Sequence, residues 1–152
     1  MRAIFPALLC AVFFPQVVAA AEPIGDWLVA GKDARIRITD CDGAMWGVVS
    51  WEKEPGMDNK NPDPGKRGRP TLGMAVLLGL KGRAANRWEG GLYNAENGKT
   101  YSGGITLLSD DMLRVRGCLL AILCGGETWT RVKAPEGGLE ETGAGLCARM
   151  SR

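Results

Sequence analysis

The chain has 152 residues, with 19 basic and 17 acidic side chains and a formal net charge of +2. A nucleic-acid-binding protein presents a strongly basic surface, so we expect no nucleic-acid partner for this chain. The sequence contains no histidine, which excludes a histidine metal site and a histidine-based catalytic triad. We expect no cofactor and no metal.

The first 21 residues have the pattern of a secretory signal peptide. Arg2 supplies an early positive charge, residues 4–18 are almost wholly apolar, and three alanines follow at 19–21. Two prolines and a short apolar span argue against a membrane anchor. We therefore predict a periplasmic or secreted protein that does not span a membrane after cleavage, with one domain at 22–132.

Four cysteines follow the predicted signal peptide, and an oxidising compartment would let them form disulfides. Four cysteines allow three pairings. We favour Cys118 with Cys124, which closes a short loop, while Cys41 and Cys147 pair with each other or stay free. A zinc site needs closer spacing such as C-x-x-C, which this sequence lacks.

Residues 22–132 read as a series of short β-strands. In the segment ARIRIT at 34–39, two arginines alternate with two isoleucines, which puts charge on one face and apolar side chains on the other. The segment LGMAVLLGL at 72–80 fits either a strand or a short helix. The other predicted strands are 25–29, 45–51, 87–93, 100–108, 112–118 and 127–132.

Turn signals separate most of these segments, and no convincing long amphipathic helix is present, so the sequence predicts an all-β fold. About eight strands in a chain of this size suit a small antiparallel up-and-down β-barrel, whose closure removes exposed sheet edges. Residues 133–152 have little apolar content and are predicted to form a flexible tail.

The segment YNAENGKTYSG at 93–103 contains Gly-Lys-Thr, the end of a phosphate-binding motif. That motif requires G-x-x-x-x-G-K-[ST] between a strand and a helix. Tyr93 stands where the first glycine is needed, and a β pattern follows Thr100. Asn97-Gly98 is instead a strong turn signal, so we predict a hairpin with a structural role for both residues.

Trp27 and Arg131 lie in the first and last predicted strands, which are neighbours in a closed barrel. The arginine can then cover the tryptophan ring through a cation–π contact of about 1 kcal/mol, a structural role for both. The arginine pairs 35/37 and 114/116 lie opposite apolar residues on their strands, so we expect them to point outward as ordinary solvated surface.

Residues 52–70 form a long polar connection rich in proline and glycine. The connection is either a solvated linker or an ordered, anion-binding loop that closes over the mouth of the barrel. The candidate ligand-binding residues in this loop are Asn61, Asp63, Arg67 and Arg69. We expect three further candidates, Trp46, Trp88 and Tyr101, to face the interior of the barrel.

Support for catalysis is weak, and we assign no catalytic residue. The serines have no histidine partner. A carboxylate pair for a hydrolase could only arise through the fold, and sequence spacing does not show one. The acidic candidates are Asp63, Glu89, Glu96, Asp110 and Asp111.

Several segments together resemble a family of exported bacterial proteins, domain of unknown function 2147. The motifs are GDW at 25–27, IRITDC at 36–41, NPDP at 61–64, WEGGLYNAENGKTY at 88–101, LRVRGC at 113–118 and TWTRV at 128–132. The Gly-x-Trp start and the arginine near the end of the last strand are also similar to the lipocalin pattern.

The resemblance implies a calycin-like, lipocalin-type barrel in the cell envelope, and it implies no known activity. By analogy of fold, we expect a non-enzymatic protein that binds a small amphiphilic or hydrophobic, lipid-like ligand. The alternative is a module that binds another envelope protein or a cell-wall polymer and has its barrel filled by side chains. Family members often have a second cysteine about five residues after the one matching Cys41; here this region reads Met45-Trp46.

Overall fold

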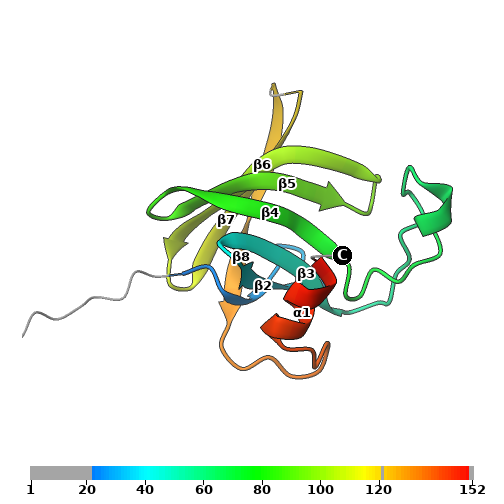
Figure 1. The fold of residues 1–152 in the computed structure, drawn as a ribbon, viewed down its shortest axis with the longest axis horizontal. Helices are drawn as coiled ribbons and strands as arrows, with labels where there is room; N and C mark the ends of the chain where they lie inside the picture. The colour runs from blue at the N-terminus through cyan, green and yellow to red at the C-terminus, as the bar shows by residue number, and fades with distance from the viewer. Residues whose placement is uncertain (1–21, 121, 151–152) are drawn as a thin grey trace, which may run out of the picture.

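The computed structural model describes residues 22–120 and 122–150, so the predicted signal peptide lies outside the described residues. Eight antiparallel strands form a closed barrel in which each strand pairs with its neighbours in the chain and the last pairs with the first (Figure 1). The predicted architecture is therefore confirmed. The strands are β1 Gly25–Leu28, β2 Ala34–Cys41, β3 Ala44–Glu52, β4 Ala75–Ala84, β5 Arg87–Asn94, β6 Lys99–Ser109, β7 Met112–Leu119 and β8 Leu123–Val132.

The barrel closes through β1, which pairs with β2 on one side and β8 on the other. Trp27 is fully buried and lies opposite Arg131 in the β1–β8 register. The guanidinium carbon of Arg131 lies 4.2 Å from the centre of the Trp27 ring, which confirms the predicted cation–π contact. Arg131 also donates hydrogen bonds to the carbonyls of Ile24 and Glu22, at 2.6 and 2.8 Å. One side chain thus ties the start of the barrel to its last strand.

The segment that fitted either a strand or a helix is strand β4. Leu77 and Leu80 are both buried in the core although they are three residues apart. A β-bulge explains this spacing, because the β4–β5 register shifts between Leu78 and Lys81, and Gly79 has a φ of +57°. In a regular strand, residues three apart point to opposite faces. The extra residue of the bulge lets Leu77 and Leu80 both point into the barrel.

The hairpin between β5 and β6 is also as predicted. Strand β5 ends at Asn94, and the backbone N–H of Gly98 donates to its carbonyl at 2.8 Å. Gly98 has a φ of +69°, and a Cβ at this position would lie 1.8 Å from the carbonyl oxygen of Lys60. Glycine is therefore needed for the turn and for the close approach of the long polar loop. Because strand β6 follows, no helix N-terminus is available to hold phosphate.

The prediction of a flexible tail after residue 132 needs correction. Residues 133–150, here called the C-terminal strap, follow the outside of the barrel and end in helix α1, Gly143–Met150 (Figure 1). Arg35 donates to the carbonyls of Glu136 and Gly137 at 2.8 and 2.7 Å, and Arg37 donates to two carbonyls further along the strap. Arginine binds the strap through backbone carbonyls, which any sequence provides. The low apolar content of residues 133–152 therefore gave no sign of this contact.

The strap also changes the outcome for the four arginines. Arg114 and Arg116 are exposed on the outer face of β7, as predicted. Arg35 and Arg37 point outward too, but they are covered by the strap, and Arg35 is buried. The prediction of a solvated surface is therefore wrong for this second pair. Arg37 further pairs with Asp26 at 3.0 Å.

Helix α1 is attached to the barrel by a disulfide between Cys147 and Cys41. Leu146 beside it is fully buried. The second disulfide, Cys118–Cys124, is the predicted one. The question left open by the sequence is resolved, because all four cysteines of the described chain are paired.

We predict that the Cys41→Ser/Cys147→Ser double variant loses about 4 kcal/mol of unfolding free energy, because this crosslink closes a loop of about 100 residues. Its sequence separation is 106 residues, against 6 for the second disulfide. The matched control, Cys118→Ser/Cys124→Ser, should lose about 2 kcal/mol. Urea unfolding followed by tryptophan fluorescence measures both. Equal losses in the two variants would contradict the prediction.

Candidate functional site

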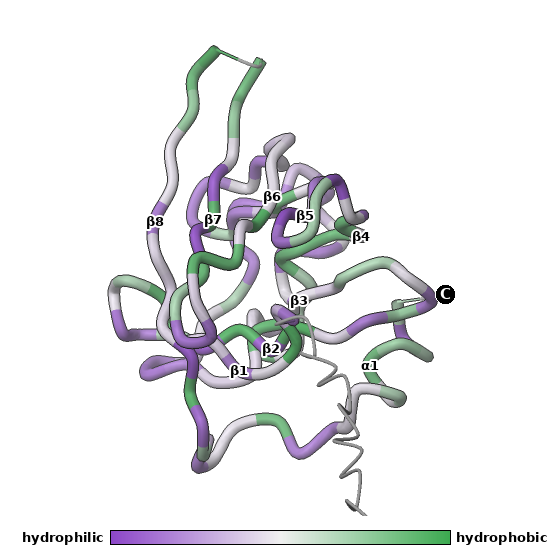
Figure 2. Tube along the Cα trace, turned by 90° about the vertical axis from the view of Figure 1, so that its left-hand side faces the viewer, coloured by the Kyte–Doolittle hydropathy of each residue, from purple (hydrophilic) through white to green (hydrophobic). Residues whose placement is uncertain are grey.

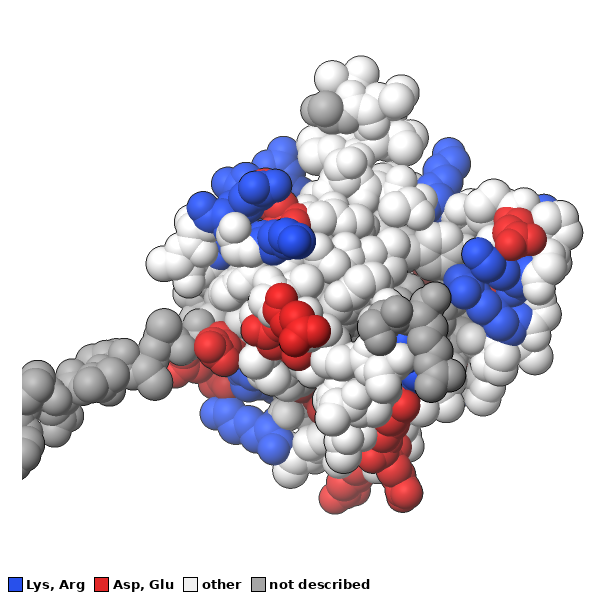
Figure 3. All heavy atoms as spheres, in the orientation of Figure 1, with Lys and Arg blue, Asp and Glu red and all other residues white. Residues whose placement is uncertain are grey.

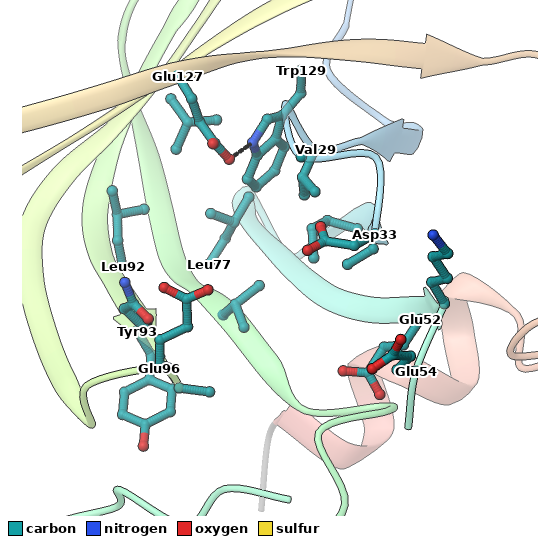
Figure 4. Close-up of a pocket in the computed structure, with 18 residues that line it drawn as sticks. Val29, Asp33, Glu52, Glu54, Leu77, Leu92, Tyr93, Glu96, Glu127 and Trp129 are labelled. Atoms are coloured by element: carbon teal, nitrogen blue, oxygen red, sulfur yellow. Dashed lines mark hydrogen bonds between the residues drawn. The ribbon is translucent and has the colours of Figure 1, made fainter. Parts of the chain in front are cut away.

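One end of the barrel is open. At this end lie the last residues of β1, β3, β5 and β7 and the first residues of β2, β4, β6 and β8, because neighbouring strands are antiparallel. A cavity of about 830 Å³ enters the barrel here (Figure 4). This volume lies within the range of about 300–1,000 Å³ that is typical of small-molecule sites.

The inner wall of the cavity is apolar. It is built from side chains that also belong to the hydrophobic core, so the cavity reaches the barrel interior. At the other end, Trp27, Leu80 and Leu113 are fully buried and fill the barrel. The interior is therefore packed at one end and hollow at the other. The core residues that line the cavity are Ile36, Leu77, Leu92, Val115 and Trp129.

The outer part of the cavity is acidic. Five carboxylates line it against one basic side chain, Lys53, and none of the five takes part in an ion pair among residues 22–120 and 122–150. Figure 4 shows the carboxylate of Glu96 pointing toward the cavity and Glu127 held against the indole of Trp129, whose N–H donates to it. The five carboxylates, here called the acidic mouth, are Asp33, Glu52, Glu54, Glu96 and Glu127.

The predicted aromatic positions do not line this cavity. Trp46 lies on the outer face of β3, since Met45 and its same-face neighbour Val49 belong to the core, and its ring lies near Gly79. Trp88 packs against the core and lines a separate hollow of about 420 Å³. Tyr101 also packs against the core. Trp46 was therefore wrongly placed, and the aromatic ring that does line the cavity, Trp129, was not predicted.

The four predicted loop residues organise the loop itself. Asp63 accepts a hydrogen bond from the backbone of Gly65 at the start of the short 3-10 helix η1, Pro64–Lys66. Arg67 donates to the carbonyl of Asn61 at 2.8 Å. None of Asn61, Asp63, Arg67 and Arg69 lines the cavity. The loop projects beside the barrel (Figure 1), and basic side chains gather on its surface (Figure 3).

A buried carboxylate, Asp58, holds this loop together. Its two oxygens accept hydrogen bonds from the Tyr93 hydroxyl at 2.6 Å, from the Asn61 amide at 2.7 Å and from Arg69, whose Nη2 lies 2.8 Å away. Tyr93 lies on β5 and also lines the cavity. The loop is thus ordered and fixed to the barrel wall through one shared tyrosine.

The surroundings of Asp58 determine its charge state. Burial alone would raise the pKa of this carboxyl, but the hydrogen bonds from Tyr93, Asn61 and Arg69, together with the charge of Arg69, outweigh burial and hold the pKa below its ordinary value. The same contact raises the pKa of Tyr93, through burial and through its hydrogen bond to the Asp58 carboxylate. Asp58 is therefore ionised, and Tyr93 is a neutral donor, at neutral pH.

In the described part of the chain, no group of three or more cysteine, aspartate and glutamate side chains could hold a metal ion. The helices described here include none that is long and apolar enough to cross a membrane.

A closed eight-stranded antiparallel barrel with a cavity at one end is a lipocalin-like fold. Among solved structures, the chain is similar to one described as "Protein HP1028 from the human pathogen Helicobacter pylori belongs to the lipocalin family". The two share 20% identity with a TM-score of 0.67, over 74% of this chain and 84% of that one. At this identity the likeness concerns the fold.

The chain belongs to the family described as "Uncharacterized protein conserved in bacteria (DUF2147)", which matches residues 25–131. A search of the curated proteins found no match. The resemblance inferred from the motifs is therefore confirmed, and the family description names no activity.

We predict that Asp58→Asn destabilises the protein by about 2–3 kcal/mol at pH 7, because the variant removes a buried charge that accepts several hydrogen bonds. The pKa of Asp58 is lower in the folded than in the unfolded chain. Its contribution is therefore complete above the unfolded value, near 3.8, and is lost as the pH falls further through the folded pKa.

Thermal unfolding of the wild type and the variant between pH 2 and pH 7 measures this difference. The gap in Tm should stay constant above about pH 5 and narrow in more acidic solution. Asp42→Asn is the matched control, since Asp42 is exposed in the β2–β3 turn with a φ of 55°, which asparagine tolerates. A gap that widens on acidification would show that the carboxylate does not stabilise the loop.

Proposed function

We propose that the protein binds a small amphiphile in the open end of its barrel and catalyses no reaction. The observation that carries this proposal is the cavity of about 830 Å³ whose inner wall is made of core side chains. An apolar tail placed against Leu77, Leu92 and Val115 would leave water in the same way as a core residue does.

The acidic mouth favours a ligand whose polar head carries a positive charge. Five carboxylates around one opening repel each other, and a cation placed between them relieves that repulsion. One oxygen of Glu52 is buried without a hydrogen-bond partner in the described residues, so a donor from the ligand would satisfy it. An ammonium group on an apolar chain matches both parts of the cavity.

Two observations bear on the alternative functions. A module that acts only through its outer loops needs no interior space, so the cavity favours ligand binding over that alternative. Several acidic side chains considered for a carboxylate hydrolase are engaged elsewhere: Asp63 pairs with Lys66, Glu89 with Arg83 and Arg87, and Asp111 with Lys133. The two disulfides support our proposal of a periplasmic or secreted protein.

We predict that dodecyltrimethylammonium, below its micelle concentration, raises the Tm of the protein by a few degrees, because it binds only the folded state. Dodecyl sulfate of the same chain length should have a much smaller effect, since the acidic mouth repels it. Differential scanning calorimetry measures Tm, and isothermal titration measures affinity.

Two sets of variants test the two parts of the cavity. Val76 also lines the cavity, so Val76→Phe should fill the space and abolish binding. Glu54→Gln/Glu96→Gln should weaken binding about threefold to tenfold. Glu140→Gln, an exposed change outside the cavity, is the matched control. If no amphiphile of either charge binds, the proposal fails; if both charges bind equally well, the apolar cavity stands and the preference for a cation is wrong.

A further inference from the structure

The hairpin of β7 and β8 ends in an exposed apolar tip. The sequence from Gly117 to Gly126 is GCLLAILCGG, ten residues without a charged side chain. Leu120, Ile122 and Leu123 are exposed to 82%, 79% and 67%. Figures 1 and 2 show this hairpin projecting from the barrel, and Figure 2 shows its end as hydrophobic. We call residues 118–120 and 122–124 the apolar finger.

The finger is held in its extended shape. Cys118 and Cys124 are register partners and form a disulfide, and Leu119 pairs with Leu123 beyond them. Leu120 has a φ of +53°, a conformation that costs a leucine energy and persists where the surrounding structure enforces it. In this crosslinked hairpin, Leu120, Ile122 and Leu123 are not buried on the barrel, so the tip is available for contact.

We propose that the apolar finger inserts into the interfacial layer of a phospholipid bilayer. Contiguous exposed apolar surface marks an interaction site. The tip offers aliphatic side chains on a convex projection, whereas protein interfaces concentrate their binding energy in tryptophan, tyrosine and arginine, with leucine under-represented. A fluid acyl layer can surround a convex tip from all sides, and a protein partner would need a matching pocket.

Charge at the base of the finger agrees with a lipid partner. Arg114 and Arg116 are exposed on β7, and neither forms an ion pair within the described ranges. Leu120 lies four positions after Arg116, a span of about 13 Å along an extended chain. A tip that enters an interface to a depth of about 5–10 Å would hold Arg116 near the lipid phosphates, which bind guanidinium groups well.

The position of the finger determines which end of the barrel would face the bilayer. Strand β7 runs toward the open end of the barrel and β8 leaves from it, so the finger and the cavity lie at the same end. A protein anchored by its finger would present this end to the bilayer.

The experiment is flotation of the protein with vesicles of phosphatidylethanolamine and phosphatidylglycerol, and separately of phosphatidylcholine. The protein is purified after export with both disulfides formed. Mass spectrometry verifies its N-terminus, so that an uncleaved apolar leader cannot account for lipid binding. We expect the wild type to float with both vesicle types. The triple variant Leu120→Ser/Ile122→Ser/Leu123→Ser should lose at least tenfold in partition coefficient, because each side chain loses its apolar contact with lipid.

Two further variants distinguish lipid binding by the finger from nonspecific hydrophobic adsorption and from electrostatic attraction. Leu108→Ser/Met112→Ser removes two other exposed apolar side chains and should float like the wild type. Arg114→Gln/Arg116→Gln should reduce flotation with phosphatidylglycerol more than with phosphatidylcholine. An unchanged Tm confirms that each variant is folded.

Two results would overturn the proposal: a wild type that stays unbound with both vesicle types, or a triple variant that floats as well as the wild type. If the unbound wild type self-associates in analytical ultracentrifugation through the same three side chains, the finger binds a protein partner instead.

Discussion

The fold depends on β1, the shortest strand, which closes the sheet into a barrel. β1 has four residues, and both of its edges must pair for the barrel to have no free edge. Trp27 fills the interior at this point, and Arg131 covers its ring while binding carbonyls that precede β1. Packing is thus concentrated at the closed end. At the opposite end, core side chains such as Leu77, Leu92 and Trp129 line the cavity instead of filling it, and there the interior is hollow.

A second layer covers the outside of β2 and β3. The C-terminal strap contributes backbone carbonyls, and β2 contributes Arg35 and Arg37 to bind them. The strap also reaches β3, where the N–H of Leu139 donates to the carbonyl of Ser50 at 2.8 Å. The wall formed by β2 and β3 is consequently covered on both faces, by the apolar core inside and by the backbone of the strap outside.

This two-sided burial explains what the sequence could and could not predict. Most strands and the turn at Gly98 follow from alternation and local turn chemistry, which a sequence states directly. Strand β3 is covered on both faces, so the pattern of its residues does not reveal that Trp46 points outward. The carbonyl contacts of the strap carry no side-chain signature. The acidic mouth comes from distant segments that only the closed barrel brings together, so neither its members nor Trp129 could be recognised as one site.

The pairing of Cys41 with Cys147 has a consequence for biosynthesis. A ribosome releases the chain from its N-terminus, so Cys41 is available long before its partner, which lies 106 residues later. Cys118 and Cys124 appear in the interval and are close enough to find each other quickly. Their early union removes the two competitors of Cys147. Order of emergence and loop length therefore lead to the native crosslinks, and a chain that lost Cys124 would leave Cys118 free to capture Cys41 wrongly.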